Sequence, residues 1–83
     1  MARFLFTINM ASKGGNVVHQ VIGEYDCDTV EEMCEVLNEN DFIVVREFYR
    51  EGPDSFHGRF VGEVCLNTMM IGKVKIDNRP VQY

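Results

Sequence analysis

The segment Thr29-Val30-Glu31-Glu32-Met33-Cys34-Glu35-Val36-Leu37-Asn38-Glu39 decides the fold, because it carries the pattern of a helix with a defined start. Thr29 precedes Glu32 by three residues, the capping-box spacing in which the hydroxyl accepts from a free amide and the glutamate reaches back. An apolar stripe follows at the i, i+3, i+4 and i+7 positions: Val30, Met33, Cys34 and Leu37. We therefore predict a helix over residues 29–39.

Strand patterns lie on both sides of this helix. Residues 3–10 alternate apolar and polar side chains, and the glycines at 14 and 15 supply a tight turn into a second strand over 17–25. These two segments predict an antiparallel hairpin. The further strands expected after the helix are 42–50, 59–66 and 71–76, followed by a loosely held tail over 77–83. The side chains expected to share one face of the fourth strand are Phe60, Val64 and Leu66.

The order ββαβββ predicts an α+β fold, with an antiparallel sheet of four to five strands and one helix packed on one face. A chain of 83 residues has the size of a single small domain, 1–83. One helix covers only one face of a sheet, so some apolar side chains are expected on the other: Leu5, Ile43, Val45 and Tyr49. This surplus indicates either a curled sheet or a partner, such as a second copy of the chain.

The three cysteines favour reduced thiols in a cytoplasmic protein, because their number is odd and they show no C-x-x-C spacing. Cys34 and Cys65 are expected to be small hydrophobic residues of the core. Cys27 is expected to be exposed, with its pKa raised by the neighbouring Asp26 and Asp28. No run of apolar residues is long enough for a membrane-spanning helix.

The charges are segregated along the chain. Eight of the thirteen acidic residues lie between Glu24 and Asp41, a segment with no Lys or Arg. The rest of the chain carries eight basic and five acidic residues, a balance of +3 within a total of −5. Glutamates at helical i, i+4 spacing repel one another by a few tenths of a kcal/mol. This segment has no lysines to offset the repulsion between its glutamates. It is therefore either a solvated face or a surface whose electrostatic field attracts a basic partner.

Motifs for chemistry are lacking in the sequence. The acids at 26 and 28 do not continue as a calcium loop, because its fifth and twelfth positions are occupied by Val30 and Leu37. His19, His57 and the cysteines have no zinc-ligand spacing, and no nucleophile has an evident base. We therefore predict no catalytic residue, no metal site and no cofactor, and a protein that is not an enzyme.

The charge pattern favours a small interaction or inhibitor protein, whose acidic helix face binds a basic surface that normally handles nucleic acid. Small inhibitors carried by phages and mobile elements, anti-CRISPR proteins among them, offer a physical analogy of this type, although no sequence motif supports kinship. The residues predicted to bind the partner are Asp28, Glu31, Glu32, Glu35, Glu39 and Asp41.

Two alternatives remain open. A hairpin with interleaved basic and aromatic residues could stack bases and hold phosphates, although the acidic chain makes nucleic acid a poor first choice as a partner. Its residues are Arg46, Phe48, Arg50, His57, Arg59 and Phe60. The other alternative is a structural homodimeric subunit that pairs through the uncovered face of the sheet, with the acidic helix merely solvated.

Overall fold

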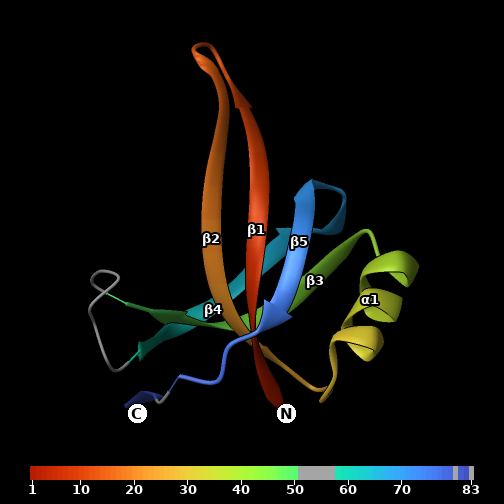
Figure 1. Cartoon of the computed structure of the whole chain (residues 1–83), viewed down its shortest axis with the longest axis vertical. Helices are drawn as coiled ribbons and strands as arrows, with labels where there is room; N and C mark the ends of the chain where they lie inside the picture. The colour runs from red at the N-terminus through yellow and green to blue at the C-terminus, as the bar shows by residue number, and fades with distance from the viewer. Residues whose placement is uncertain (51–57, 80, 83) are drawn as a thin grey trace.

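The computed structural model describes residues 1–50, 58–79 and 81–82, and its strands form one curved sheet with a helix at its side (Figure 1). Within these residues the sheet has six strands in the order β5-β1-β2-β3-β4-β6. The elements along the chain are β1 (Ala2–Ser12), β2 (Gly15–Tyr25), α1 (Val30–Glu39), β3 (Phe42–Tyr49), β4 (Gly58–Asn67), the 3₁₀ turn η1 (Thr68–Met70), β5 (Ile71–Ile76) and β6 (Val81–Gln82). The predicted α+β class and the order ββαβββ up to β5 are confirmed.

The end of the chain differs from the prediction. Among the described residues, β6 is a sixth strand, and its pairing with β4 is parallel, whereas the other neighbouring strands pair antiparallel. The expected loosely held tail is therefore wrong for residues 77–79 and 81–82. Asp77 is buried, and its amide donates to the carbonyl of Arg3 at 2.9 Å, which fixes the direction of the segment that leads to β6.

β1 and β2 form the longest pair in the sheet. Their register runs from Ala2 opposite Tyr25 to Ser12 opposite Gly15. β5 pairs with β1 only along 4–8, and β3 pairs with β2 only along 22–24. Residues 9–20, which we call the distal ribbon, therefore extend beyond the rest of the sheet as two strands alone (Figure 1).

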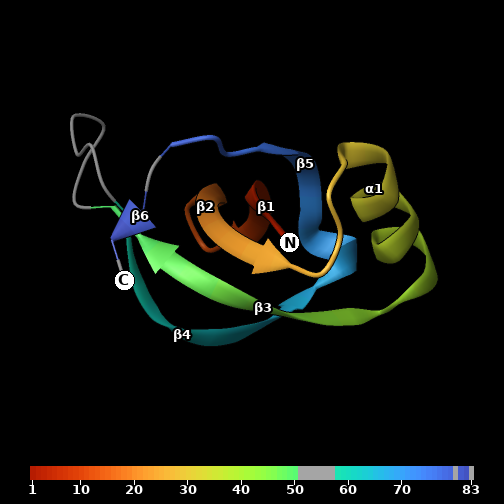
Figure 2. The ribbon, with the colours of Figure 1, turned by 90° about the horizontal axis from the view of Figure 1, so that it is seen from below.

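The core lies on the concave face of the curled sheet, where α1 closes the side between β5 and the start of β3 (Figure 2). Its fully buried side chains are Phe4, Phe6, Met33 and Val45. Ile43 joins this cluster as well, so Ile43 and Val45 do not lie on an uncovered face. A curled sheet is one of the two expected explanations for the surplus apolar residues. The curl brings β3 toward the face of β1 that packs against α1, and this buries Ile43 and Val45.

Gly23 allows β2 and β3 to approach each other. A Cβ atom at this position would lie 2.6 Å from Cγ2 of Val45 and 3.2 Å from the ring of Phe6. Carbon atoms at rest are about 3.5–4.0 Å apart, so a side chain here would push the strands away from each other. The glycine thus sets the depth at which the hairpin packs against β3.

A bulge in β4 changes the face of one predicted core residue. Gly62 has φ +137°, and the register with β3 shifts between Glu47, opposite Gly62, and Phe48, opposite Phe60. The irregularity breaks the two-residue alternation, so Phe60 does not share a face with Val64 and Leu66. Phe60 instead packs edge-on against Phe48, with ring centroids 5.7 Å apart, on the face of the sheet opposite α1.

The start of α1 agrees with the sequence. Thr29 is the N-cap: its hydroxyl accepts from the amide of Glu32 at 3.1 Å and lies 3.1 Å from the Glu32 carboxylate, to which it donates. The apolar stripe, however, is rotated relative to the prediction. Met33 is buried and Cys34 is exposed, because the helix rests its side at Val36 and Leu37 against the core cluster beside β5.

The cysteines are placed opposite to the prediction. Cys27 is buried, since its amide and carbonyl bond to Tyr25 and Ala2 where the two ends of the hairpin meet, whereas Cys34 and Cys65 are exposed. Burial first, and then the nearby acids, raise the pKa of the Cys27 thiol. In the described residues no helix combines the length and the apolar character that crossing a membrane requires.

Candidate functional site

The acidic side chains around α1 are exposed. We call this set the acidic surface; its residues are Asp28, Glu31, Glu32, Glu35, Glu39 and Asp41. Met33 anchors the opposite side of the helix in the core, so the glutamates that follow it at helical spacing point outward. The helix stands at one side of the molecule, beside β5 and the start of β3 (Figure 2).

Within the described part of the chain, the glutamates of the acidic surface have no base as an ion-pair partner. No ion pair between described residues includes Glu31, Glu35 or Glu39, and the last turn of α1 contains no basic residue. The N-terminal ammonium, in contrast, lies 2.9 Å from Asp28, and this hydrogen bond raises the pKa of the terminal amine. The field of the surface therefore comes mainly from the glutamates of α1 and not from Asp28.

Exposed apolar residues adjoin the C-terminal end of α1. The amide of Thr68 donates to the carbonyl of Asp41 at 3.0 Å, so η1 is held beside the start of β3. The helix itself ends where the side chain of Asn40 donates to the carbonyl of Val36 at 2.8 Å. The large apolar side chains exposed at this joint are Phe42, Val44, Met69 and Met70. We call them the apolar rim.

The predicted nucleic-acid patch is only partly assembled on one face. Arg46, Phe48 and Phe60 share the face of the sheet opposite α1, with the guanidinium of Arg46 4.9 Å from the centre of the Phe60 ring. Phe48, however, is only 2% exposed, and Arg46 lies 3.7 Å from the buried Glu24. Its ring and its cation are thus already engaged within the protein.

The other members of that patch lie elsewhere. Arg50 is buried beside Asp77, and Arg59, the neighbour of Phe60 in the strand, pairs opposite Tyr49. Adjacent residues of a strand point to opposite faces, so Arg59 is separated from Phe60. His57 lies outside the described residues.

A buried charge cluster was missed by the sequence reasoning. The carboxylate of Asp77 lies 2.9 Å from Nε of Arg79 and 3.5 Å from a terminal nitrogen of Arg50. The side chains of Arg50 and Asp77 are each only 4% exposed, and we call the three residues the Asp77 clamp. Because Arg50 and Asp77 are 27 positions apart, no local pattern could have indicated their contact.

The clamp controls the ionisation of Asp77. Burial by itself would raise the pKa of this carboxyl. The side-chain and backbone hydrogen bonds from Arg79, with the charges of Arg79 and Arg50, outweigh burial and hold the pKa below its ordinary value. Asp77 is therefore a charged acceptor at neutral pH.

The described part of the chain brings together no group of three or more His, Cys, Asp or Glu side chains that could hold a metal ion. Comparison with protein-family models, with curated proteins and with solved structures gave no match.

Proposed function

We propose that this protein is a binding protein of the inhibitor type, which docks the acidic surface of α1 on a basic surface of a partner protein that normally handles nucleic acid. The observation that carries this proposal is the row of exposed glutamates on α1, which form no ion pair with any of the residues that the structure describes. Such a row costs the free helix a little stability through repulsion. That cost is recovered when the lysines and arginines of a partner face it.

The mechanism follows from helical geometry. Glu31, Glu35 and Glu39 are four residues apart, so their backbone positions are about 6 Å apart along the helix axis. Carboxylates in a row accept charge-assisted hydrogen bonds from arginine forks as phosphates do. Their field also accelerates encounter with a basic partner at low salt.

The apolar rim supplies what the charges cannot. Exposed ion pairs contribute about 0–1 kcal/mol each, so the acids give orientation and on-rate more than affinity. Phe42 is 60% exposed and Met69 is 85% exposed, and both lie at the end of the acidic surface. Aromatic residues and methionine are enriched at interfaces, where their burial provides binding energy. We infer that the partner covers both α1 and the apolar rim.

The homodimeric alternative is supported by a separate observation. Tyr49 and Val61, which lie outside the apolar rim, are about half exposed on the neighbouring strands β3 and β4. Light scattering during size-exclusion chromatography separates the two ideas. A strict monomer over a wide concentration range removes the homodimer and leaves the hetero-partner.

The decisive experiment is capture of partners from the lysate of the native host at low salt, with three glutamates of α1 neutralised. The test variant carries Glu31→Gln, Glu35→Gln and Glu39→Gln. A matched control removes three acidic charges elsewhere, with Asp26→Asn, Glu47→Gln and Glu63→Gln. Circular dichroism confirms that both variants fold.

We expect a partner that is retained by the control, lost by the test variant and released by added salt. The captured partner should be basic at the surface that it presents. Equal recovery with both variants, or binding that is indifferent to salt, would contradict the proposal.

A further inference from the structure

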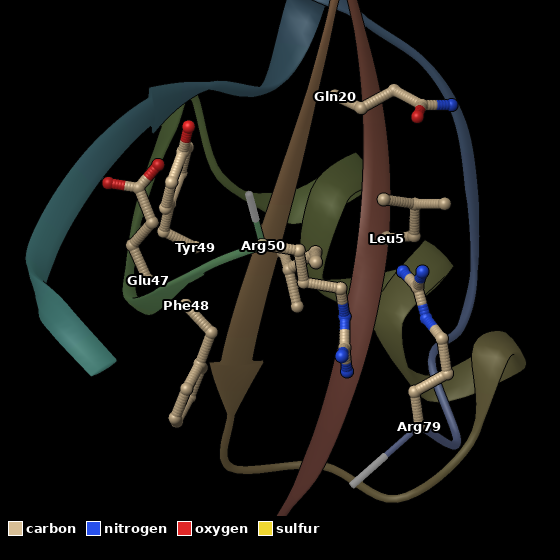
Figure 3. A pocket seen from close by; sticks show the side chains of 8 residues that line it. Leu5, Gln20, Glu47, Phe48, Tyr49, Arg50 and Arg79 are labelled. Atoms are coloured by element: carbon tan, nitrogen blue, oxygen red, sulfur yellow. The ribbon is translucent and has the colours of Figure 1, made fainter. Parts of the chain in front are cut away.

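The segment that follows β5 crosses the face of the sheet opposite α1 and leaves a groove there. One hollow of about 310 Å³ lies between this segment and the end of β3. An adjoining hollow of about 460 Å³ lies along residues 75–79. Both are lined by Leu5, Gln20 and Arg79, so they form the two halves of one depression. We call it the Arg79 groove (Figure 3).

The floor of the groove is apolar. Leu5 from β1, Ile22 from β2 and Phe48 from β3 line it, and the last two are nearly fully buried. Gln20 adds an amide at its side, whereas the hydroxyl of Tyr49 points away from Arg50 and Arg79 (Figure 3). Polar and apolar surface contribute about equally to the lining of the whole groove, and each of its two hollows has a volume at the lower end of the range usual for small-molecule sites.

Arg79 is held in place at the groove. Its Nε donates to Asp77, its amide donates to the same carboxylate oxygen, and its carbonyl accepts from Arg3 at 2.8 Å. Among the described residues, no acceptor is bonded to its two terminal nitrogens. The guanidinium lies beside Leu5 in Figure 3. A guanidinium already oriented by its Nε offers a planar pair of donors at little further entropic cost.

The charges at the groove favour an anion. The described residues that line it include three bases, Arg50, Arg79 and Lys75, and two acids, Asp77 and Glu47. Both oxygens of Asp77 are engaged by the arginines. Glu47 is the opposing acid, but Figure 3 shows its carboxylate directed away from Arg50 and Arg79. The groove is thus a locally basic site in a chain of net charge −5, and it favours an anionic ligand although the chain as a whole is acidic.

We propose that the Arg79 groove binds a small organic oxyanion, a carboxylate or phosphate ester, whose apolar body rests against Leu5 while the terminal nitrogens of Arg79 donate to its oxygens. The buried ion pair between Arg50 and Asp77 fits this role. Its burial carries a desolvation penalty that hydrophobic packing would avoid, and in return it fixes Arg79. The site lies on the face opposite α1, so it stands independently of the partner-binding proposal.

The test is a titration of the whole ¹⁵N-labelled protein, followed by amide chemical shifts. The probes are benzoate, phenyl phosphate and, as a neutral body of the same kind, benzyl alcohol. We expect saturable shifts at Gln20, Ile22 and Arg79 with the two anions and much weaker shifts with the alcohol. The anion that binds more tightly identifies the oxyanion that the groove prefers.

Two variants make the result specific. Arg79→Gln should weaken anion binding at least about tenfold, because hydrogen bonds to charged groups contribute about 1.5–3 kcal/mol. Lys13→Gln, at the exposed tip of the hairpin, removes the same charge far from the groove and should leave binding unchanged. Gln20→Glu adds an acid at the groove without changing the clamp, and its repulsion should also weaken anion binding. This second variant tests the proposal even if Arg79→Gln perturbs the fold.

Three results would overturn the proposal. They are the absence of saturable shifts at the groove, equal binding of benzyl alcohol and benzoate, and anion binding that survives both Arg79→Gln and Gln20→Glu.

Discussion

The acidic surface of α1 and the Asp77 clamp treat charge in opposite ways. On α1, like charges from neighbouring turns are exposed to water, where repulsion is screened and inexpensive. In the clamp, opposite charges from Arg50, Asp77 and Arg79 are gathered in a largely buried cluster. From this contrast we infer that the charges most evident in the sequence contribute little to folding, whereas the charges that contribute most lie far apart in the sequence.

The sharpest test of this contrast is Asp77→Asn. It leaves the buried guanidinium of Arg50 without this carboxylate, so we expect the free energy of unfolding to fall by about 3 kcal/mol. Asp41→Asn, which removes an exposed acid at the end of α1, should change it by less than about 0.5 kcal/mol. Urea unfolding measures both values, and similar effects of the two substitutions would break the comparison.

The contribution of the Asp77 clamp to the free energy of unfolding should depend on pH. The pKa of Asp77 is lower in the folded chain than its ordinary value, so the clamp stabilises fully above about pH 4. This contribution is lost as the pH falls through the lowered pKa. The difference in urea midpoint between the natural chain and Asp77→Asn should therefore shrink as the pH falls below about 4. A difference that stays constant as the solution is acidified would argue against the clamp.

The helix that carries the acidic surface, α1, is stabilised by its N-cap residue Thr29. Thr29→Ala removes the acceptor for the amide of Glu32 and should lower the free energy of unfolding by about 1 kcal/mol. Thr29→Ser retains the hydroxyl and serves as the control, with little expected change. If the two variants are equally stable in urea, the capping contact does not stabilise the helix.

The smallest expected change in stability comes from Glu35→Lys, which also tests partner binding. Glu35→Lys places a lysine between Glu31 and Glu39 at i, i+4 spacing, so it should raise the free energy of unfolding by about 0.5 kcal/mol. The same change should weaken partner capture, because it reverses the charge at the centre of the acidic surface. A variant that is more stable and binds equally well would show that α1 is merely solvated.

Local patterns predicted the elements well. The Thr29 cap and the limits of α1 follow from side chains within a few residues of one another. The hairpin follows from alternation and a glycine turn, and the exposed glutamates follow from helical spacing. These features could be predicted because each depends on contacts that are short in sequence.

What could not be predicted depends on distant contacts. The side of α1 that is buried is set by where the helix meets β5, which decides that Cys34 is exposed. The face of Phe60 depends on the bulge at Gly62, and the order of the tail depends on Arg50. In each case the deciding residue lies on another strand or disrupts a regular period.

The distal ribbon, residues 9–20, gives the molecule an arm that can open by itself. Its backbone bonds join two strands alone, and an isolated hairpin is only marginally stable in water. Amide protons of the ribbon should therefore exchange with solvent through local opening, while those of 4–8, which have a strand on each side, wait for global unfolding. Loosening of the arm leaves Phe4 and Phe6 packed, so the tip of the hairpin is the place where an inserted peptide would disturb the body least.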